Sequence, residues 1–383
     1  MVVPALGLGR SFAGERRGVA TEAELRLDVE RKKGIKLGCA WLAAHKNGDG
    51  SFGDAKAIVA FTALSALALM SDGSSINRGP YGEQVRMAID FLVKLVETPA
   101  RHDVPDGFFA RPNDISSKMH GQGYATLALA SAIGSADEEF AKRIRAVLVK
   151  AVRVCEDSQT GTGGWGYSPM AATEHEGSVT VTIAQGLRAA RDAGIKVNGA
   201  KIRYGLRYLD KSQKNLPGQE EDGSFKYSLM QEKSSYALTS AAISAYALFG
   251  EYGSTVEERD RITRGINFIK RRLPRVIRDH EWLYYGNFYA AWAAWQKDGD
   301  QPDPLPGQSY GIDPTSRDIE RTTQFWGPWH SKVYPYILSL QRADGHWNEE
   351  VDEDKFNFGE LLPTAFAVLT LAIPDELVPI FQR

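Results

Sequence analysis

Hydrophobic and polar positions along the chain define two kinds of helical segment that follow one another. The first kind is amphipathic, with aromatic and branched side chains on one face and charged ones on the other, as around Trp41-Leu42 and Tyr208-Leu209. The second kind is apolar on nearly all sides, as in residues 57–70, 123–133, 237–249 and 363–373. Amphipathic helices belong on a surface and apolar helices in an interior, so the pattern predicts an outer layer around an inner one. No stretch shows the alternation that predicts a strand.

A short signature separates the two kinds of helix: an acidic residue or glycine, then a glycine, then a nearby aromatic residue. Its central glycines are at positions 50, 107, 164, 223 and 345. The spacing defines a period of about 57–61 residues, and the longest interval holds a degenerate copy around Trp282-Leu283-Tyr284-Tyr285-Gly286. Six copies of a two-helix unit predict an all-α protein, an (α/α)6 toroid with six inner and six outer helices. A solenoid is the rival architecture, but it requires polar terminal repeats, and the sixth unit is as regular as the first.

The bulk properties narrow the class of protein and its partners. We expect residues 1–29 to be an N-terminal extension and residues 30–383 to form one toroid domain of six repeats. The composition, 43% hydrophobic and 25% charged, is typical of a globular protein, and a net charge of -2 without a basic stripe argues against nucleic acid as a partner. No run approaches the ~18 apolar residues of a membrane span. We therefore expect a soluble cytoplasmic protein; peripheral membrane contact and an exported precursor with a removed signal are the alternatives.

The repeat units resemble the QW-type repeat of the terpene cyclase and protein prenyltransferase superfamily, also named the prenyltransferase/squalene oxidase repeat. The residues that carry the resemblance are an aromatic helix end, a glutamine, a glycine and a final aromatic residue, present as Tyr208, Gln213, Gly223 and Phe225 and again as Tyr336, Gln341, Gly345 and Trp347. Residues 119–129 and 177–180 are similar to single-toroid bacterial members related to squalene cyclases. The resemblance covers roughly residues 30–375. It implies the toroid fold and an isoprenoid ligand.

The motifs that carry the known reactions of this superfamily are missing. Squalene-cyclase-like enzymes protonate an alkene with the middle Asp of an Asp-x-Asp-Asp-Thr motif. When its threonine is aligned with Thr180, Glu176 takes the first position and Ser178 takes the position of the acid. Zinc-dependent prenyltransferases need an Asp-x-Cys pair, which neither Cys39 nor Cys155 supplies, and the Cys-x-Glu-Gln of thioester domains is absent. The resemblance therefore leaves the reaction open.

Polar side chains nevertheless lie where the predicted inner helices begin. His120 and Ser178 occupy equivalent positions in their repeats, and Glu176 and Glu360 precede the third and sixth inner helices. A histidine and carboxylates that converge on one rim can transfer protons, so His120, Glu176 and Glu360 are the candidate catalytic residues. A weaker alternative is a divalent metal bound by His120, His175 and Glu176; otherwise no cofactor is expected. Acidic residues also favour helix N-termini as caps, so a structural role is a further alternative.

Aromatic side chains on the predicted inner helices are the candidate lining of a central funnel. A cavity lined by aromatic faces suits an isoprenoid chain or a carbocation, whereas core packing is the structural alternative. The candidates for substrate binding are Tyr124, Tyr236, Tyr285, Phe288, Tyr289, Trp292 and Phe366.

Three functions are compatible with the sequence. The leading hypothesis is an isoprenoid-binding enzyme, similar to terpene cyclases or prenyltransferases, that holds an apolar polyene in the funnel. In it His120 is the proton donor or acceptor, and Glu176 and Glu360 adjust its pKa. The second is a non-catalytic toroid that binds a lipid or a protein partner. The third is a carbohydrate-active enzyme, since other (α/α)6 barrels act on sugars with paired carboxylates. A shared fold does not choose among them.

Overall fold

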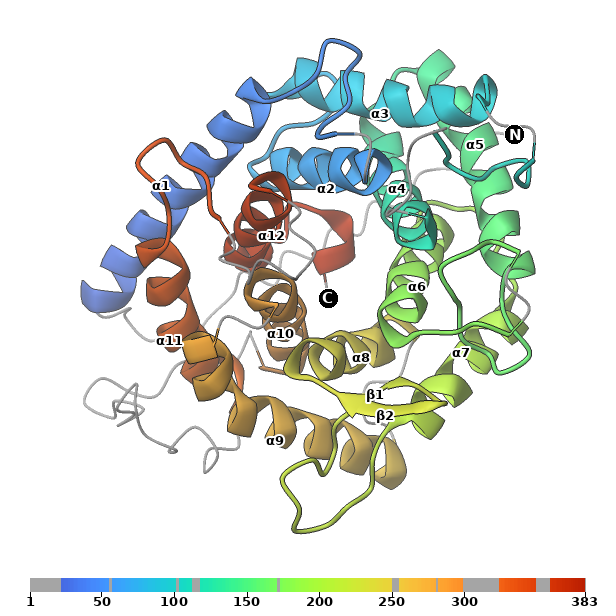
Figure 1. The fold of residues 1–383 in the computed structure, drawn as a ribbon. Helices are drawn as coiled ribbons and strands as arrows, with labels where there is room; N and C mark the ends of the chain where they lie inside the picture. Colours follow the sequence, from blue (N-terminus) through green and yellow to red (C-terminus); the bar gives the residue numbers. More distant parts are fainter. Residues whose placement is uncertain are drawn as a thin grey trace, which may run out of the picture.

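The computed structural model describes residues 22–54, 57–100, 103–111, 118–170, 173–249, 255–279, 282–298, 324–348 and 359–382. Within these residues the chain forms two concentric rings of α-helices (Figure 1). The inner ring consists of α2 (Ile58–Ser71), α4 (Lys118–Ala132), α6 (Gly177–Asp192), α8 (Tyr236–Phe249), α10 (Leu283–Asp298) and α12 (Leu361–Ala372). The outer ring consists of α1 (Glu22–Ala44), α3 (Gly82–Glu97), α5 (Glu138–Asp157), α7 (Gly199–Ser212), α9 (Val256–Asp279) and α11 (Trp326–Ser339). This is the (α/α)6 toroid that the repeat predicts.

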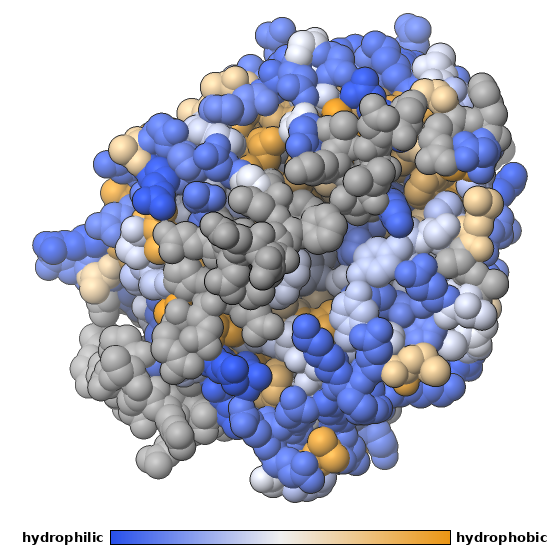
Figure 2. Space-filling model, viewed as in Figure 1, coloured by the Kyte–Doolittle hydropathy of each residue, from blue (hydrophilic) through white to orange (hydrophobic). Residues whose placement is uncertain are grey.

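Burial separates the two rings as the hydrophobic pattern predicts. Every residue of α2 is buried, and α4, α8 and α12 are buried over most of their length. The outer helix α3 instead buries one stripe, which includes Val85, Ile89, Leu92 and Val96, at the spacing of one helical face. Figure 2 shows that the surface over the outer helices is largely hydrophilic. In the described part of the chain, no helix has both the length and the apolar content needed to cross a membrane.

Each signature turn is joined to its inner helix by a repeated hydrogen bond. In the first unit the backbone N–H of Phe52 donates to Thr62 Oγ1 over 3.0 Å. The glycine before it, Gly50, has a φ of 90°, and a Cβ there would lie 2.6 Å from the carbonyl oxygen of Met87 in α3. The turn therefore lets one unit pack closely against the next. Equivalent hydrogen bonds join Phe109 to Gln122, Trp165 to Thr180, Phe225 to Thr239 and Trp347 to Thr364.

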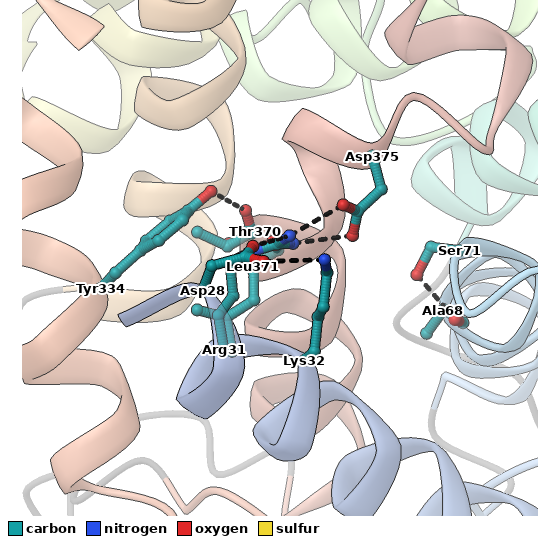
Figure 3. Close-up of polar contacts among 9 residues, drawn as sticks. All are labelled: Asp28, Arg31, Lys32, Ala68, Ser71, Tyr334, Thr370, Leu371 and Asp375. Atoms are coloured by element: carbon teal, nitrogen blue, oxygen red, sulfur yellow. Dashed lines mark hydrogen bonds and ion pairs between the residues drawn. The ribbon is translucent and has the colours of Figure 1, made fainter. Parts of the chain in front are cut away.

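The ring closes where the sixth unit packs against the first. A Cβ at Gly345 would lie 2.5 Å from the carbonyl oxygen of Leu37 in α1, the same contact that Gly50 makes within the ring. Arg31 of α1 is buried and donates to both carboxylate oxygens of Asp375, over 2.7 and 2.8 Å, and to the Leu371 carbonyl over 2.7 Å (Figure 3). This charge-assisted, bidentate pair fixes the seam between units that are far apart in sequence.

The segment after α12 returns to the ring axis through the short helices η3 (Ile373–Asp375) and η4 (Pro379–Phe381) (Figure 1). Val378 and Phe381 are buried, and Trp295 Nε1 donates to Glu376 Oε1 over 2.9 Å. The rings of Phe381 and Trp292 are 5.8 Å apart between centroids. Because Trp292 and Trp295 lie towards the C-terminal end of α10, this segment covers the end of the inner ring opposite the first turns of its helices.

Two features differ from the sequence-based expectations. The described residues include a small antiparallel hairpin, β1 (Lys226–Ser228) and β2 (Gln231–Ser234), beside α8, so the expectation of no strand is wrong there. Strands of this length are too short to show a period of two in the sequence. Helix α1 begins at Glu22 and so includes residues 22–29, which were expected to belong to the extension.

A single turn of 3-10 helix, η1 (Ile133–Ser135), follows α4.

Candidate active site

The candidate site lies at the first turns of the inner helices α4, α6 and α10. These turns carry His120, Ser178 and Tyr285, each of which keeps some accessible surface in an otherwise buried layer. Helices α4 and α6 approach closely because a glycine faces each contact. A Cβ at Gly123 would lie 2.6 Å from the Thr182 carbonyl oxygen, and one at Gly186 would lie 2.8 Å from the Gly123 carbonyl oxygen. This proximity brings the first turn of α4 within hydrogen-bonding reach of the first turn of α6.

The side chains of His120, Ser178 and Glu176 form a continuous hydrogen-bonded line, which we call the His120–Ser178–Glu176 relay. Nε2 of His120 lies 2.8 Å from Ser178 Oγ. Ser178 Oγ donates to Glu176 Oε2 over 2.6 Å, and the backbone N–H of Val179 donates to the same oxygen over 2.9 Å. Glu176 is therefore the N-cap of α6 as well as the end of the relay. The order differs from that of a serine hydrolase, in which the imidazole lies between the hydroxyl and the carboxylate.

Burial sets the charge states along the relay. It lowers the pKa of His120 from 6.5 to about 4. It raises the pKa of Glu176, against the opposing effect of the hydrogen bonds from Ser178 and from the Val179 amide. Both shifts favour the uncharged forms, because transfer of a charge out of water is unfavourable. A proton that can lie at either end of the relay is therefore held more readily by the Glu176 carboxyl group than by the His120 imidazole.

Tyrosines that the sequence analysis did not single out surround the relay. The ring of Tyr167 lies 5.6 Å from that of His120, and its hydroxyl is 2.5 Å from the hydroxyl of Tyr227. Burial, followed by the negative charge of Glu176, raises the pKa of Tyr167. Tyr167 and Tyr227 each follow the signature aromatic residue of their unit by two positions. Alignment of the repeats is therefore the signal that could have identified them.

His175 does not join His120 and Glu176. Its Nδ1 lies 3.2 Å from the hydroxyl of Tyr208 in the outer helix α7, and it is buried against that ring. The residue that follows, Glu176, has extended backbone and directs its side chain to the opposite side, towards Ser178. The three groups of the alternative metal site thus do not converge. Among the described residues, no cluster of three histidine, cysteine or acidic side chains could hold a metal ion.

Glu360 also lies apart from the relay. It precedes α12, its side chain is half exposed, and Oε1 is 3.7 Å from Nε2 of His346 in the signature turn of the sixth unit. Glu360 occupies in the sixth unit the position that Glu176 occupies in the third unit. Because the third and sixth units lie on opposite sides of the ring, the two carboxylates are far apart. The structure brings together two of the three candidate catalytic residues, His120 and Glu176, and adds Ser178 between them.

Below the relay, aromatic side chains from α4, α10 and α12 form a layer across the ring axis. The hydroxyl of Tyr124 lies 3.2 Å from that of Tyr289, which donates to Gln185 Oε1 over 3.0 Å. Phe366 contacts the rings of Tyr124, Tyr285 and Phe288. Helices α4 and α10 lie on opposite sides of the ring, so the ring is filled with side chains at this depth (Figure 1). A role of these residues in substrate binding stays a prediction.

Two other predicted lining residues lie elsewhere. The hydroxyl of Tyr236 donates to Asn287 Oδ1 over 2.8 Å and accepts from Trp329 Nε1 over 3.2 Å. Because Trp329 belongs to the outer helix α11, Tyr236 is directed between the two rings and is no longer a candidate for substrate binding. Trp292 lies deeper than the aromatic layer, against Phe288 and Phe381.

Comparison with known proteins identifies the fold. No family model matches the chain, and no curated protein matches it. The type II terpene cyclase MstE from Scytonema in its apo form has a TM-score of 0.52 and 16% identity, over 92% of this chain and 99% of that chain. Two structures of the same enzyme in complex with its substrate geranylgeranyl dihydroxybenzoate have TM-scores of 0.51 and 0.52 at 16% identity, over 93% of this chain and 99% of theirs. At this identity the likeness is one of fold: the chain has the fold of a type II terpene cyclase.

Proposed function

We propose that the protein is a terpene cyclase-like enzyme that binds an isoprenoid inside the ring and acts on it by proton transfer through the His120–Ser178–Glu176 relay. The continuous hydrogen bonding of these three side chains at the first turns of the inner helices carries the proposal. The fold supports it, because solved MstE structures of the same fold hold a geranylgeranyl substrate. The proposed ligand is a hydrophobic small molecule. No cofactor enters the steps described below.

The relay can deliver a proton without leaving a charge on the imidazole. In the neutral resting state the Glu176 carboxyl donates to Ser178, Ser178 donates to Nε2 of His120, and Nδ1 carries a proton. Transfer of the Nδ1 proton to an alkene carbon forms a C–H bond and a carbocation. In the same concerted step one proton shifts from Ser178 to Nε2 and one from Glu176 to Ser178, so no imidazolate forms. The negative charge left behind is on Glu176, where the Ser178 hydroxyl and the Val179 amide stabilise it.

The same relay closes the cycle. After cyclisation, Nδ1 of His120 accepts the proton that the final carbocation loses, one C–H bond breaks, and a double bond forms. The protons shift back along Ser178 to Glu176, so the product is an isomer of the substrate. Alkenes are weak bases, so the opening protonation needs a dry site and a pre-positioned acid; burial of Glu176 excludes water, and its hydrogen bond with Ser178 fixes its position.

The proposal gives a physical account of the missing acid motif. Ser178 occupies the position of the acid in the squalene-cyclase motif, and the carboxyl group occupies the first position, as Glu176. A serine cannot protonate an alkene, but it can conduct a proton between two neighbours. Tyr285 lies in the first turn of α10, and its ring and that of Phe288 contact Phe366 in the aromatic layer below the relay. Such rings are suited to stabilise positive charge.

The test combines a substrate screen with isotope labelling. Purified protein is incubated with polyprenyl alcohols and prenylated aromatic compounds in deuterium oxide, and products are analysed by gas chromatography and mass spectrometry. We expect a cyclised isomer that carries one deuterium on carbon. The Ser178→Ala variant keeps both end groups but interrupts the relay, so its rate should fall by about 100-fold or more. Glu176→Gln should behave similarly, whereas Glu174→Gln, at the exposed residue two positions earlier, is the matched control and should keep the rate.

Two outcomes would overturn the proposal. One is normal turnover by a His120→Ala, Glu176→Ala double variant. The other is protein that neither retains nor converts any polyprenyl compound.

A second candidate function is isoprenoid binding without turnover. The observation that favours it is the filled ring axis, where Tyr124, Tyr289 and Phe366 contact one another. On this reading the toroid carries a lipid or binds a partner. It predicts a co-purifying isoprenoid that native mass spectrometry detects and that stays chemically unchanged over many hours. For the third reading, a carbohydrate-active site, Glu360 and Glu176 do not form the expected carboxylate pair, because Glu360 faces His346.

A further inference from the structure

Positive charge is concentrated in the part of the chain that runs from the start of α5 to the turn after α7. Residues 138–214 contain 13 lysine and arginine residues but eight aspartate and glutamate residues, a net charge of +5. The whole protein has a net charge of -2, so the rest of the chain is acidic. Because these cations are separated along the sequence, no basic run marks them there, and only the fold brings them onto one surface.

The exposed face of α7 is a row of three cations. Arg203, Arg207 and Lys211 follow one another every four residues, so they lie on one side of the helix, and all three are exposed. The acidic residue of α7, Asp210, faces the inner ring, where its carboxylate accepts a hydrogen bond from the Tyr246 hydroxyl of α8 over 3.1 Å. The row therefore has no carboxylate of its own helix on the same side.

The exposed face of α5 repeats this spacing. Arg145, Val149 and Arg153 are exposed at every fourth residue. The two helices follow one another in the outer ring (Figure 1), and Glu156 Oε1, near the end of α5, accepts from the backbone N–H of Asn198, the N-cap of α7, over 2.6 Å. We define the α5–α7 basic face by six exposed cations: Arg145, Arg153, Lys196, Arg203, Arg207 and Lys211.

These six cations have no carboxylate partners within the described part of the chain. Other exposed cations of the outer ring do have them, at the four-residue spacing of one helical face. Arg26 pairs with Glu22 in α1, and Lys142 pairs with Glu138 in the first turns of α5. Like charges four residues apart on a helix repel each other, so the α5–α7 basic face is unfavourable on its own and favourable when an anionic surface covers it.

The residue types of the face distinguish between anionic partners. Protein interfaces have a core of aromatic and apolar side chains and few lysines, whereas Val149 is the one large hydrophobic residue exposed on the described parts of α5 and α7. Single-stranded nucleic acid is bound in grooves with aromatic stacking, whereas this face lies on the outside of the ring. A plane of anionic lipid headgroups requires only exposed cations, and each of them strengthens binding about fivefold.

We propose that the α5–α7 basic face docks the protein on an anionic lipid surface. The inference goes beyond the proposed function and does not depend on the reaction, because none of the six cations belongs to the relay or to the aromatic layer. Docking also suits an apolar ligand, since an isoprenoid dissolves in a membrane rather than in water. The surface then holds the ring beside the phase that contains its ligand.

Vesicle sedimentation tests the proposal with the full chain. The probes are vesicles of phosphatidylcholine alone and vesicles of equal parts phosphatidylcholine and phosphatidylserine. We expect the protein to bind the mixed vesicles but not the neutral ones, and to bind less as added salt screens the charges. The triple variant Arg203→Gln, Arg207→Gln, Lys211→Gln removes one row of the face and should lower the binding constant about 100-fold.

A second triple variant is the matched control. Arg26→Gln, Lys32→Gln, Lys94→Gln removes the same number of charges from exposed positions of α1 and α3, where each cation already has a carboxylate partner. Its binding constant should stay close to that of wild-type protein. Both variants should unfold at nearly the same urea concentration as wild-type protein, since all six substituted side chains are exposed.

Four outcomes would overturn the proposal. Equal losses in the two triple variants would mean that binding follows the net charge rather than this face. Absence of binding to both kinds of vesicle, or equal binding to both, would show that anionic lipid is not recognised. Tight binding to a DNA duplex without binding to the mixed vesicles would assign the face to nucleic acid. Docking without conversion of any polyprenyl compound would support the inference and leave only the proposed function in question.

Discussion

Replacement of His120 by glutamine tests whether the relay is as desolvated as the structure indicates. Glutamine can keep a hydrogen bond to Ser178 but cannot be protonated in the accessible pH range. Burial lowers the pKa of His120 from 6.5 to about 4, so the folded protein takes up this proton less readily than the unfolded chain. The stabilising contribution is fully present above pH 6.5 and is lost as the pH falls through the folded-state value near 4.

The size of the effect follows from the shift. One pKa unit corresponds to about 1.4 kcal/mol, so the wild-type protein should lose up to about 3 kcal/mol of stability, relative to His120→Gln, as the pH falls from 7 to about 4. The raised pKa of Glu176 acts in the opposite direction: its contribution is present below its ordinary value of 4.5 and is lost as the pH rises through the folded-state pKa. That contribution is common to both proteins and largely cancels in the difference between them.

The assay is urea unfolding followed by circular dichroism at several pH values across this range. The free energy of unfolding of each protein is extrapolated to water, and the difference between wild type and His120→Gln is plotted against pH. Parallel curves, with a difference that changes by less than about 0.5 kcal/mol, would refute the reasoning. They would mean that the imidazole titrates in the folded protein as it does in the unfolded chain.

Two further predictions concern packing. Gly123→Ala should lower the free energy of unfolding by about 1–3 kcal/mol in urea unfolding, because its Cβ would lie 2.6 Å from a backbone oxygen of α6. Gly134→Ala, with open space around it, is the control and should be close to neutral. Equal effects would refute the close approach of α4 and α6. Arg31→Met should cost about 2–3 kcal/mol, since it leaves Asp375 without its partner, while Lys32→Met should stay within about 0.5 kcal/mol because Lys32 is exposed. Equal losses for these two would show that the seam pair adds no more than a surface charge.

The architecture followed from the sequence because the repeat encodes it redundantly. Each unit carries a sharp glycine turn, an amphipathic helix and an apolar helix, and the period located even the degenerate fifth unit, whose inner helix is α10. The hydrogen bond that joins a signature turn to a side chain of its inner helix, such as that from Phe52 to Thr62, was not predicted. An isolated threonine in an apolar helix carries no distinguishing pattern. The β1–β2 hairpin was missed because its strands are shorter than any detectable alternation.

The site was predictable only in part. Repeat alignment gave His120 and Ser178 the same height on their helices, but their contact depends on the glycines that bring α4 and α6 together. The same alignment could not show that Glu360 lies across the ring. Nor could it show that neighbouring residues His175 and Glu176 point to opposite sides, because that follows from the extended backbone at the N-cap of α6.

Closure of the ring has a consequence for how the protein comes apart. In an open array of repeats the terminal units have one neighbour each and fray first, so partial unfolding is easy. In this toroid each inner helix has a neighbour on both sides, and the first and last of the described units meet at the seam held by Arg31 and Asp375. We therefore expect amide hydrogens of α2 to α10 to exchange together, in one cooperative opening, and those of α1 to exchange earlier. The seam would then be the point from which the whole structure opens.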